Sequence, residues 1–323
     1  MTKNLIMSMR KIPKRDSSNK QIVKKTFMIN RSNILKDILL EKGWIEGNIN
    51  LMNNFTMWDT YLSKIVDGKI MLLPRQKIRS IDVKSTFFKR LFVNNVKCFY
   101  PKTYFHIENT IINKNKLYFL KNSYSTDGKH VYCINSDNKD FISTIKKPKE
   151  YILQENIENI YLLDDRKTVI RVYMIYINNK LYLYTDGNMV VMNDIYDERN
   201  TNIHVNIQNH YKCHSLSTLK DYNVIIKNIE NNMKEVSKEF NSDPYHEDTE
   251  KDIFHIFGFD YILNKNLDPY VIEVNGYPSL FKDKRDNFNK LKKHLLENIY
   301  EILINKKPIN NKYFVFLTEC FEK

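Results

Sequence analysis

The sequence predicts an α+β fold, because hairpin signals and amphipathic helical stretches both occur along its 323 residues. Residues 168–185 and 257–275 each contain two apolar runs joined by a short polar turn, which is the composition of a β-hairpin. Residues 216–240 and 284–304 instead repeat apolar side chains at helical spacing, which indicates helices that bury one face. A chain of this length can form two or three packed subdomains.

Shorter patterns predict the remaining elements. In chain order, we expect helical segments within 31–66, a helix near 83–92, a strand near 99–105, and short strands at 116–121, 130–134 and 151–154. We divide the chain into a basic, flexible tail at 1–30, an N-terminal domain at 31–108, a central subdomain at 109–190 and a C-terminal subdomain at 191–323.

Charge favours an anionic partner. The net charge is +13, from 51 basic and 38 acidic residues, which suits an acidic protein segment, nucleic acid or an anionic lipid surface. The four cysteines are scattered, without the spacing of a metal site or a disulfide framework. The chain lacks an apolar run of about 18 residues and a secretory signal, so we expect a cytoplasmic protein without a membrane span.

The hairpin at 257–275 carries the strongest functional signal. Folding it about its middle places Asp260 opposite Glu273, and side-chain alternation puts Glu273 and Asn275 on one face. Two carboxylates directly opposite one another destabilise a sheet. A divalent cation held by carboxylate and amide oxygens would offset that repulsion. A protonated carboxyl group, or an ion pair with a nearby Arg or Lys, would offset it as well.

A lysine at the end of a strand is the second signal. Lys121 closes an apolar run and opens the polar loop 122–129, whose amides and hydroxyl groups could surround a polyphosphate. A lysine followed by a polar turn is also a common surface feature, so this signal alone is weak.

Buried cations are the third signal. Arg171 lies inside an apolar strand, where its burial requires an anion, and Lys167 stands at the mouth of the same strand. The structural explanation is an ion pair with Asp164 or Asp165, and the functional one is a phosphate or carboxylate ligand. Together, the three signals are the parts of a Mg-nucleotide site. The chain has neither a P-loop nor the protein-kinase motifs.

The order of these motifs resembles the tubulin tyrosine ligase-like family of ATP-grasp ligases. The family's terminal signature is similar to Gly258-Phe-Asp260 followed by Pro269-Tyr-Val-Ile-Glu273-Val-Asn275-Gly-Tyr-Pro278-Ser-Leu280. The stretch 154–171 resembles the family's adenine hinge with its following Lys and Arg, and 99–103 looks like its entry to the central domain. The likeness spans roughly residues 70–305.

The resemblance implies an ATP-grasp fold, in which a nucleotide lies between two α+β subdomains preceded by a smaller N-terminal domain. It implies ATP and Mg²⁺ as cofactors, with Asp260, Glu273 and Asn275 as metal ligands and with Lys167 and Arg171 as catalytic cations facing the reacting phosphate. The nucleotide-binding residues it implies are Lys121, Ser125, Thr126, Gly128, Lys129, Gln154, Glu155, Asn156 and Ile157.

Five positions depart from the family pattern. Asn122 replaces a proline, His130 a glycine and Val169 an aspartate, while Thr185 and Val190 stand where the family typically places arginines. One of those arginines helps to bind the amino-acid substrate in the family. These departures leave ATP binding better supported than any particular ligation.

The resemblance therefore predicts an ATP- and Mg²⁺-dependent ligase that adds an amino acid to a protein carboxylate through an acyl-phosphate. An acidic tail such as that of tubulin would suit the basic chain as acceptor. Two alternatives belong to other classes: a degenerate ATP-grasp domain that binds nucleotide or an acidic partner without turnover, and a nucleic-acid-binding protein that uses the basic residues 1–26. A ligase acting on a small molecule is a further alternative.

Overall fold

The computed structural model describes residues 26–27, 34–46, 70–72, 81–125, 130–202, 206, 210–240, 252–280, 282, 284 and 286–320. Helices and largely antiparallel sheets both occur within these ranges, so the predicted α+β class is confirmed. Apart from Thr26 and Phe27, the predicted basic tail lies outside the described residues. Within the described ranges, no helix combines the length and apolar character that crossing a bilayer requires.

The elements, in chain order, are β1 (Thr26–Phe27), α1 (Ile34–Glu41), β2 (Ile45–Glu46), β3 (Ile70–Leu72), α3 (Lys84–Val93), β4 (Thr103–Tyr104), β5 (Tyr118–Asn122), β6 (Val131–Ile134), β7 (Tyr151–Glu155), β8 (Leu162–Leu163), β9 (Arg166–Ile177), β10 (Lys180–Met192), β11 (His210–Ser215), α5 (Tyr222–Ser237), β12 (Asp252–Leu263), β13 (Pro269–Asn275), α6 (Asp286–Leu303) and β14 (Phe314–Glu319). Both predicted hairpins and both long helices form where the patterns placed them. One expectation is wrong in part, because β2 is a strand paired with β1 inside the segment expected to be helical.

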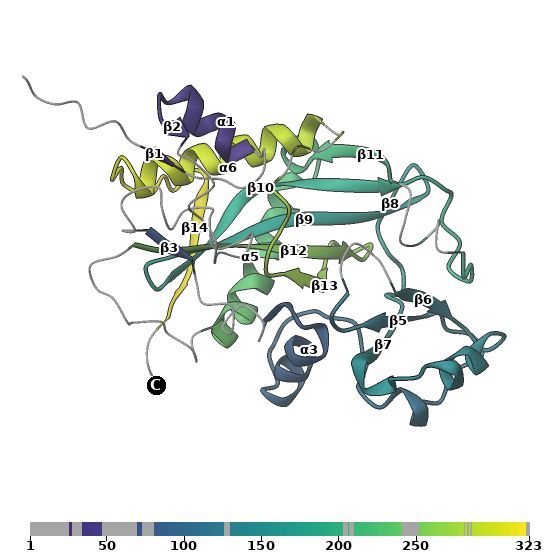
Figure 1. Ribbon diagram of the computed structural model, residues 1–323. Helices are drawn as coiled ribbons and strands as arrows, with labels where there is room; N and C mark the ends of the chain where they lie inside the picture. Colours follow the sequence, from purple (N-terminus) through teal and green to yellow (C-terminus); the bar gives the residue numbers. More distant parts are fainter. Residues whose placement is uncertain are drawn as a thin grey trace, which may run out of the picture.

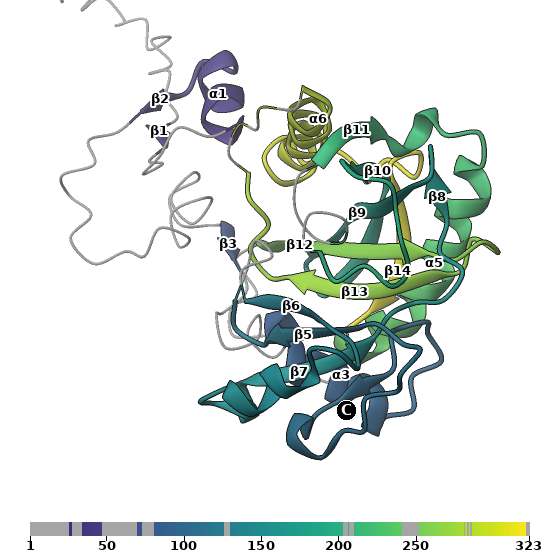
Figure 2. The ribbon, with the colours of Figure 1, turned by 90° about the vertical axis from the view of Figure 1, so that its right-hand side faces the viewer.

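Two sheets organise the molecule (Figure 1). The larger one has the strand order β11-β10-β9-β12-β13, with β3, β8 and β14 attached to it, and the smaller has the order β4-β7-β5-β6. The smaller sheet lies beside the edge formed by β13, as a view from the side shows (Figure 2). The smaller sheet thus follows the β13 edge of the larger one.

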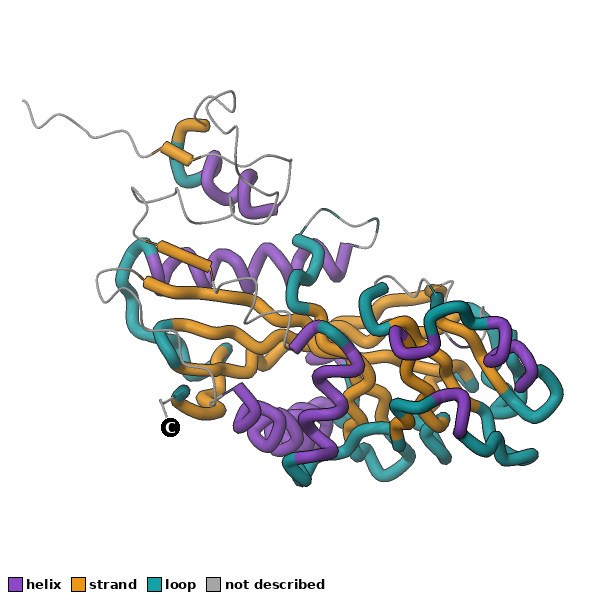
Figure 3. The backbone as a smooth tube through the Cα atoms, turned by 60° about the horizontal axis from the view of Figure 1, so that its bottom comes forward, coloured by secondary structure: helices purple, strands orange, loops and turns teal. Residues whose placement is uncertain are grey.

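The long strand β9 separates two cores. Val172 and Met174 pack in the cluster that contains α5, whereas Tyr173 and Ile175 pack in the cluster that contains α6. The helices accordingly cover opposite faces of the large sheet (Figures 1 and 3). Since side chains alternate along a strand, Arg171 projects from the same face as Tyr173. Lys167 and Arg171 of β9 therefore lie on the face of the large sheet that α6 covers.

A two-residue turn fixes the register of β9 against β10. Asn178 and Asn179 have φ angles of 45° and 63°, and Ile177 pairs directly with Lys180. Positive φ at both central residues is the geometry of a type I′ turn, which Asn tolerates better than most residues. The local sequence therefore sets which side chains of both strands share the Arg171 face.

Helix α1 packs on α6 at the outer surface. Trp44, just after α1, donates a hydrogen bond from its indole nitrogen to the Tyr300 hydroxyl at 3.0 Å. Ile38 and Leu39 of α1 are fully buried in the same core cluster as Ile299 of α6. The N-terminal part of the described chain is thereby joined to the C-terminal helix.

Gly187 lies where the register of β10 shifts, and we expect Gly187→Ala to destabilise the fold. A Cβ at this position would lie 2.5 Å from the Arg171 carbonyl oxygen and 2.8 Å from Val172 Cγ1, so the backbones would have to separate. We expect a loss of about 1–3 kcal/mol, in the range of overpacking substitutions. Urea unfolding measures the change, with Lys290→Ala on the exposed side of α6 as the control. Equal midpoints for both variants would contradict the expected crowding.

Candidate functional site

A cavity of about 690 Å³ is lined by both sheets and by α6. It gathers eleven of the residues that the sequence singled out: Lys121, Ser125, Gln154, Glu155, Asn156, Ile157, Lys167, Arg171, Asp260, Glu273 and Asn275. The other three, Thr126, Gly128 and Lys129, lie outside the described residues. Residues up to 154 positions apart in the chain, counted from Lys121 to Asn275, therefore face one space.

The carboxylate hairpin has the register that its sequence predicts. Asp260 of β12 pairs directly with Glu273 of β13, and Gly258 pairs with Asn275. The register shifts between Asp260 and Tyr261, which is a β-bulge and turns the local strand. Asp260, Glu273 and Asn275 all line the cavity, as the predicted shared face requires.

Arg171 lies on the other side of Asp260, directly opposite it in the pairing of β9 with β12. Its Nη2 donates to Asp260 Oδ2 at 2.8 Å, and its Nε donates to the second carboxylate oxygen. The structural explanation through Asp164 or Asp165 is therefore wrong: both have positive φ angles, of 52° and 55°, in the turn before β9, and the partner is a strand neighbour distant in sequence. Gly258 leaves room for this pair, since a Cβ there would lie 3.3 Å from Arg171 Nη1.

The pair keeps the guanidinium charged. Burial alone would lower the pKa of Arg171, but the charge of Asp260 and its hydrogen bonds raise that pKa above the ordinary value. The arginine thus remains a fixed positive charge on the wall of the cavity.

Lys84 is a site residue that the sequence analysis missed. Its ammonium nitrogen lies 3.1 Å from Glu273 Oε1 and donates to the Ser125 carbonyl oxygen at 2.6 Å, and its side chain is 5% exposed. It stands in the buried stripe of α3, at helical spacing from Phe87 and Leu91. A lysine in an apolar stripe was the available signal, because such a residue must reach a polar partner.

Cations therefore neutralise both carboxylates of the hairpin. Arg171 pairs with Asp260 and Lys84 with Glu273, which is the ion-pair alternative that the sequence left open. The donor set still fits a hard divalent cation, because two carboxylates and the Asn275 amide line one wall. Among the described residues no three His, Cys, Asp or Glu side chains cluster, so such a cation would depend on the amide as its third ligand.

Two buried lysines face the same space from the opposite side. The ammonium nitrogens of Lys121 and Lys167 lie 5.9 Å and 4.5 Å from the centroid of the Phe119 ring. Burial lowers the pKa of Lys121 to about 8, against the attraction of Glu273. Burial also lowers the pKa of Lys167 to about 7, with a contribution from the neighbouring Lys121. An anion placed between them would favour the charged forms of both.

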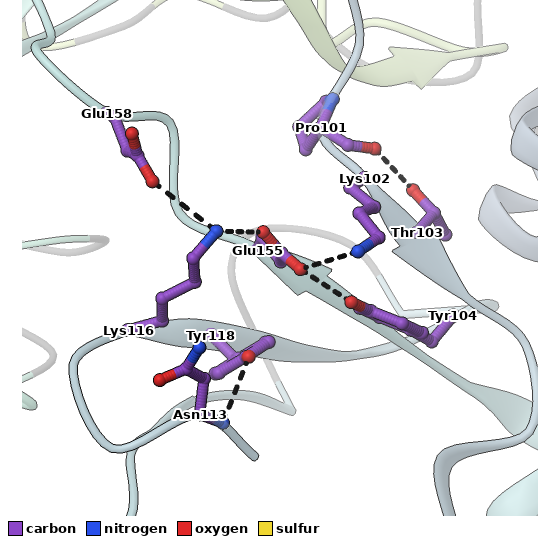
Figure 4. Close-up of polar contacts among 9 residues, drawn as sticks. All are labelled: Pro101, Lys102, Thr103, Tyr104, Asn113, Lys116, Tyr118, Glu155 and Glu158. Atoms are coloured by element: carbon purple, nitrogen blue, oxygen red, sulfur yellow. Dashed lines mark hydrogen bonds and ion pairs between the residues drawn. The ribbon is translucent and has the colours of Figure 1, made fainter. Parts of the chain in front are cut away.

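The strand β7 contributes backbone rather than charge. Figure 4 shows the Glu155 carboxylate held by Tyr104, Lys116 and Lys102, at 2.5, 2.7 and 3.3 Å. Burial acts to raise the pKa of Glu155, but the hydrogen bonds from these partners lower it overall. Its side chain is committed to this network, so a ligand beside Glu155 would meet the main chain of the strand.

The neighbours of Glu155 are also fixed. Gln154 is 1% exposed and donates from its amide nitrogen to Thr103 Oγ1 at 3.0 Å. Asn156 donates from its amide nitrogen to the Tyr196 hydroxyl at 2.9 Å. These contacts hold the segment rigidly along the cavity, which suits recognition of a flat ligand edge by backbone groups.

Two of the departures from the family pattern meet in the cavity. Val169 of β9 and Val190 of β10 are direct cross-strand partners, and both line it. Thr185 is not among the lining residues; its hydroxyl donates to the Lys312 carbonyl oxygen at 3.1 Å. His130 stands where the family has glycine and adopts a φ of 52°. One wall of the site is thus an apolar pair.

Fold and site together define a class of protein: an α+β chain with fixed cations and a carboxylate hairpin around one cavity between two sheets. Comparison with known proteins is consistent with this class. The profile of the tubulin-tyrosine ligase family matches residues 195–311. The probable tubulin polyglutamylase TTLL9 of Bos taurus is 27% identical over 214 residues, covering 57% of this chain and 44% of the relative.

A second relative is more distant in source. The probable alpha-tubulin polyglutamylase Ttll1 of Tetrahymena thermophila is 24% identical over 235 residues, covering 59% of this chain and 55% of the relative. The chain spans about half the length of the curated relatives it matches. With the motifs quoted above, these matches support a tubulin tyrosine ligase-like family member.

We expect Lys167→Met to stabilise the ligand-free protein near neutral pH. The pKa of Lys167 is about 7 in the fold against 10.5 for an ordinary lysine, so between these values the unfolded chain binds more protons. Burying the charge of Lys167 lowers the free energy of unfolding, and this cost is felt in full below pH 7. The cost shrinks as the pH rises through that window, because the folded protein then holds the lysine in its neutral form. The variant should gain about 1–3 kcal/mol at pH 7 and lose the advantage towards pH 10.

Thermal unfolding at stepped pH measures this effect. The control is Lys147→Met, whose side chain is 73% exposed and which should show no such dependence. A difference between wild type and Lys167→Met that stays constant from pH 7 to pH 10 would rule out the depressed pKa.

Proposed function

We propose that this chain is an ATP- and Mg²⁺-dependent ligase that joins an amino acid to a carboxylate of a protein acceptor. The observation that carries the proposal is the convergence of Lys121, Arg171 and the Asp260–Glu273–Asn275 hairpin on one cavity. The relatives named as probable tubulin polyglutamylases support an acidic tubulin tail as the acceptor. A net charge of +13 favours encounter with such a tail.

In this proposal the nucleotide lies between the two sheets, as in an ATP-grasp fold. Lys121 and Lys167 would bind its phosphates, and the main chain along 154–157 would bind the adenine. Asp260, Glu273 and Asn275 would hold Mg²⁺, which supplies positive charge against the triphosphate when bound. Lys84 and Arg171, which now neutralise the carboxylates, would then be available to anionic groups of the substrates.

Two bond exchanges complete the reaction. In the first, an oxygen of the acceptor carboxylate attacks the γ-phosphorus, and the bond from that phosphorus to the ADP oxygen breaks. In the second, the amine of the amino acid attacks the acyl carbon, the bond to the phosphate oxygen breaks, and the nitrogen gives up a proton to water. Arg171, released from Asp260 when the metal ion is bound, would stabilise the charge that develops on the oxygens in both exchanges.

A second candidate function follows from the apolar pair. Val169 and Val190 leave the β10 side of the cavity without the charges found in the family pattern, which favours a domain that binds nucleotide without turnover. Incubation with ATP, Mg²⁺, tubulin and mixed amino acids separates the two. Release of ADP with a matching mass increase on tubulin supports the ligase, whereas nucleotide binding with neither signal supports the binder.

We expect Glu273→Gln to reduce ADP release by at least 100-fold. The amide removes one anionic ligand from the candidate metal site and leaves Lys84 without its carboxylate partner. Circular dichroism and the unfolding midpoint establish that the variant is folded. Glu230→Gln on α5, which removes a half-buried carboxylate paired with Lys227 and Lys234 outside the cavity, is the matched control and should keep full activity. Wild-type turnover in folded Glu273→Gln would remove this carboxylate from the metal site.

Lys121→Ala should weaken ATP binding by about 10- to 100-fold, because a desolvated lysine pairs strongly with phosphate. The binding should also change its proton balance. With a pKa of about 8 in the free protein, Lys121 takes up part of a proton when a polyanion binds at pH 8. Calorimetry in two buffers of different ionisation enthalpy measures both quantities. Unchanged affinity and unchanged proton uptake would show that Lys121 does not contact the nucleotide.

A further inference from the structure

Lys84 contacts two elements that a bound metal-nucleotide complex would also reach. Its ammonium nitrogen lies 3.1 Å from Glu273 Oε1 on β13 and donates to the Ser125 carbonyl oxygen, in the loop after β5, at 2.6 Å. The side chain is 5% exposed and lines the cavity. A buried positive charge thus stands at the candidate metal site, and no motif of the sequence assigns it a role.

The main chain of the same residue limits where the ammonium group can move. Lys84 is the first residue of α3, and its backbone nitrogen donates to the Ser123 carbonyl oxygen at 3.2 Å. The Ser123 nitrogen in turn donates to the Glu150 carbonyl oxygen at 2.7 Å, directly before β7. Lys84 is therefore fastened to the smaller sheet, and its ion pair with Glu273 crosses to the hairpin.

The two ion pairs of the hairpin differ in geometry. Arg171 donates to both carboxylate oxygens of Asp260, which makes a bidentate pair. Lys84 instead faces Glu273 with a compact ammonium group, whose distance to Oε1 is 3.1 Å. A bidentate guanidinium pair is the stronger of the two types. The pair of Lys84 and Glu273 is therefore the first to yield to a competing cation.

A divalent cation and the Lys84 ammonium group compete for the same carboxylate. Mg²⁺ takes carboxylate oxygens at about 2.0–2.1 Å, so a cation on Glu273 would lie close to the ammonium group. Like charges at such a separation repel one another strongly in a site shielded from water. Binding of the cation to Glu273 therefore requires the ammonium group to withdraw.

The remaining charges of the cavity add to this repulsion. Among the described residues that line it, five are basic and three are acidic: Lys84, Lys121, Lys167, Arg171 and Lys292 against Glu155, Asp260 and Glu273. Glu155 is moreover neutralised by Lys102 and Lys116, which are not lining residues. A bare divalent cation thus meets a positive cavity, whereas a cation carried by a triphosphate brings compensating negative charge.

We propose that Lys84 is a built-in counter-ion of Glu273 that keeps bare divalent cations out, so that the metal ion binds only together with a nucleotide. The inference rests on the metal-nucleotide site of the proposed function and gives Lys84 a positioning role. On binding, Glu273 exchanges the ammonium group for the cation, and Lys84 keeps the Ser125 carbonyl oxygen as its acceptor. Because coupling is reciprocal, metal and nucleotide each raise the affinity for the other by the same factor.

The test measures Mn²⁺ binding with and without a non-hydrolysable ATP analogue, by the water-proton relaxation that protein-bound Mn²⁺ enhances. Wild type should bind bare Mn²⁺ about 100-fold more weakly than Mn²⁺ offered with the analogue. Lys84→Met should bind bare Mn²⁺ about 10-fold more tightly than wild type, because the competing charge is gone. Lys84→Arg keeps the charge and should stay close to wild type.

Two controls separate this role from packing. Lys89→Met removes a lysine from the exposed side of the same helix and should leave the affinity for bare Mn²⁺ unchanged. The double variant Lys84→Met/Glu273→Gln should bind bare Mn²⁺ no more tightly than Glu273→Gln alone, because the gain depends on the released carboxylate. A role in packing alone would lower the unfolding midpoint without moving the Mn²⁺ affinity. If Lys84→Met does not fold, Lys84→Gln takes its place.

Two results would overturn the inference and leave the proposed function standing. One is a wild type that binds bare Mn²⁺ as tightly as it does with the analogue. The other is a folded Lys84→Met variant whose affinity for bare Mn²⁺ equals that of wild type. Failure of wild type to bind Mn²⁺ even with the analogue would instead refute the metal-nucleotide site itself, and the inference with it.

Discussion

A row of four charges, Arg171, Asp260, Glu273 and Lys84, is the interaction on which the site depends. Three adjacent strands and one helix contribute it, in the order positive, negative, negative, positive. Without the outer cations, the two central carboxylates would repel one another across the hairpin. Because Lys84 also holds the Ser125 carbonyl oxygen, the same row fastens the smaller sheet to the larger one. An ion pair and a hydrogen bond of one lysine therefore link the two walls of the cavity.

The charged groups of the cavity are only partly stabilised by one another. The carboxylates are paired with cations, and Lys121 and Lys167 lie in a setting that disfavours their charge. Such a site costs stability in isolation and is better balanced with a ligand of several negative charges and its metal ion. Charged groups in such unfavourable surroundings are more common at ligand-binding sites than in regions that only pack.

The sequence predicted the features that depend on local patterns, namely the hairpins and their register. Period-two alternation and the Asn-rich turns were enough to place Asp260 opposite Glu273 and to register β9 against β10. The partner of Arg171 could not be read in this way, because the pairing of β9 with β12 joins residues 89 positions apart. Lys84 was missed for a related reason: it stands on a helix whose apolar pattern indicates only burial. What it contacts depends on how the helix docks on the sheets.

The docking of α1 on α6 has a consequence for how the chain tolerates shortening. Ile38, Leu39 and Trp44 cover part of the apolar side of α6, and an earlier turn of the same helix reaches the cavity through Phe288. A protein beginning after residue 46 would leave this part bare to water, a surface prone to self-association. Insolubility, rather than a clean loss of chemistry, would then be the first symptom of N-terminal truncation.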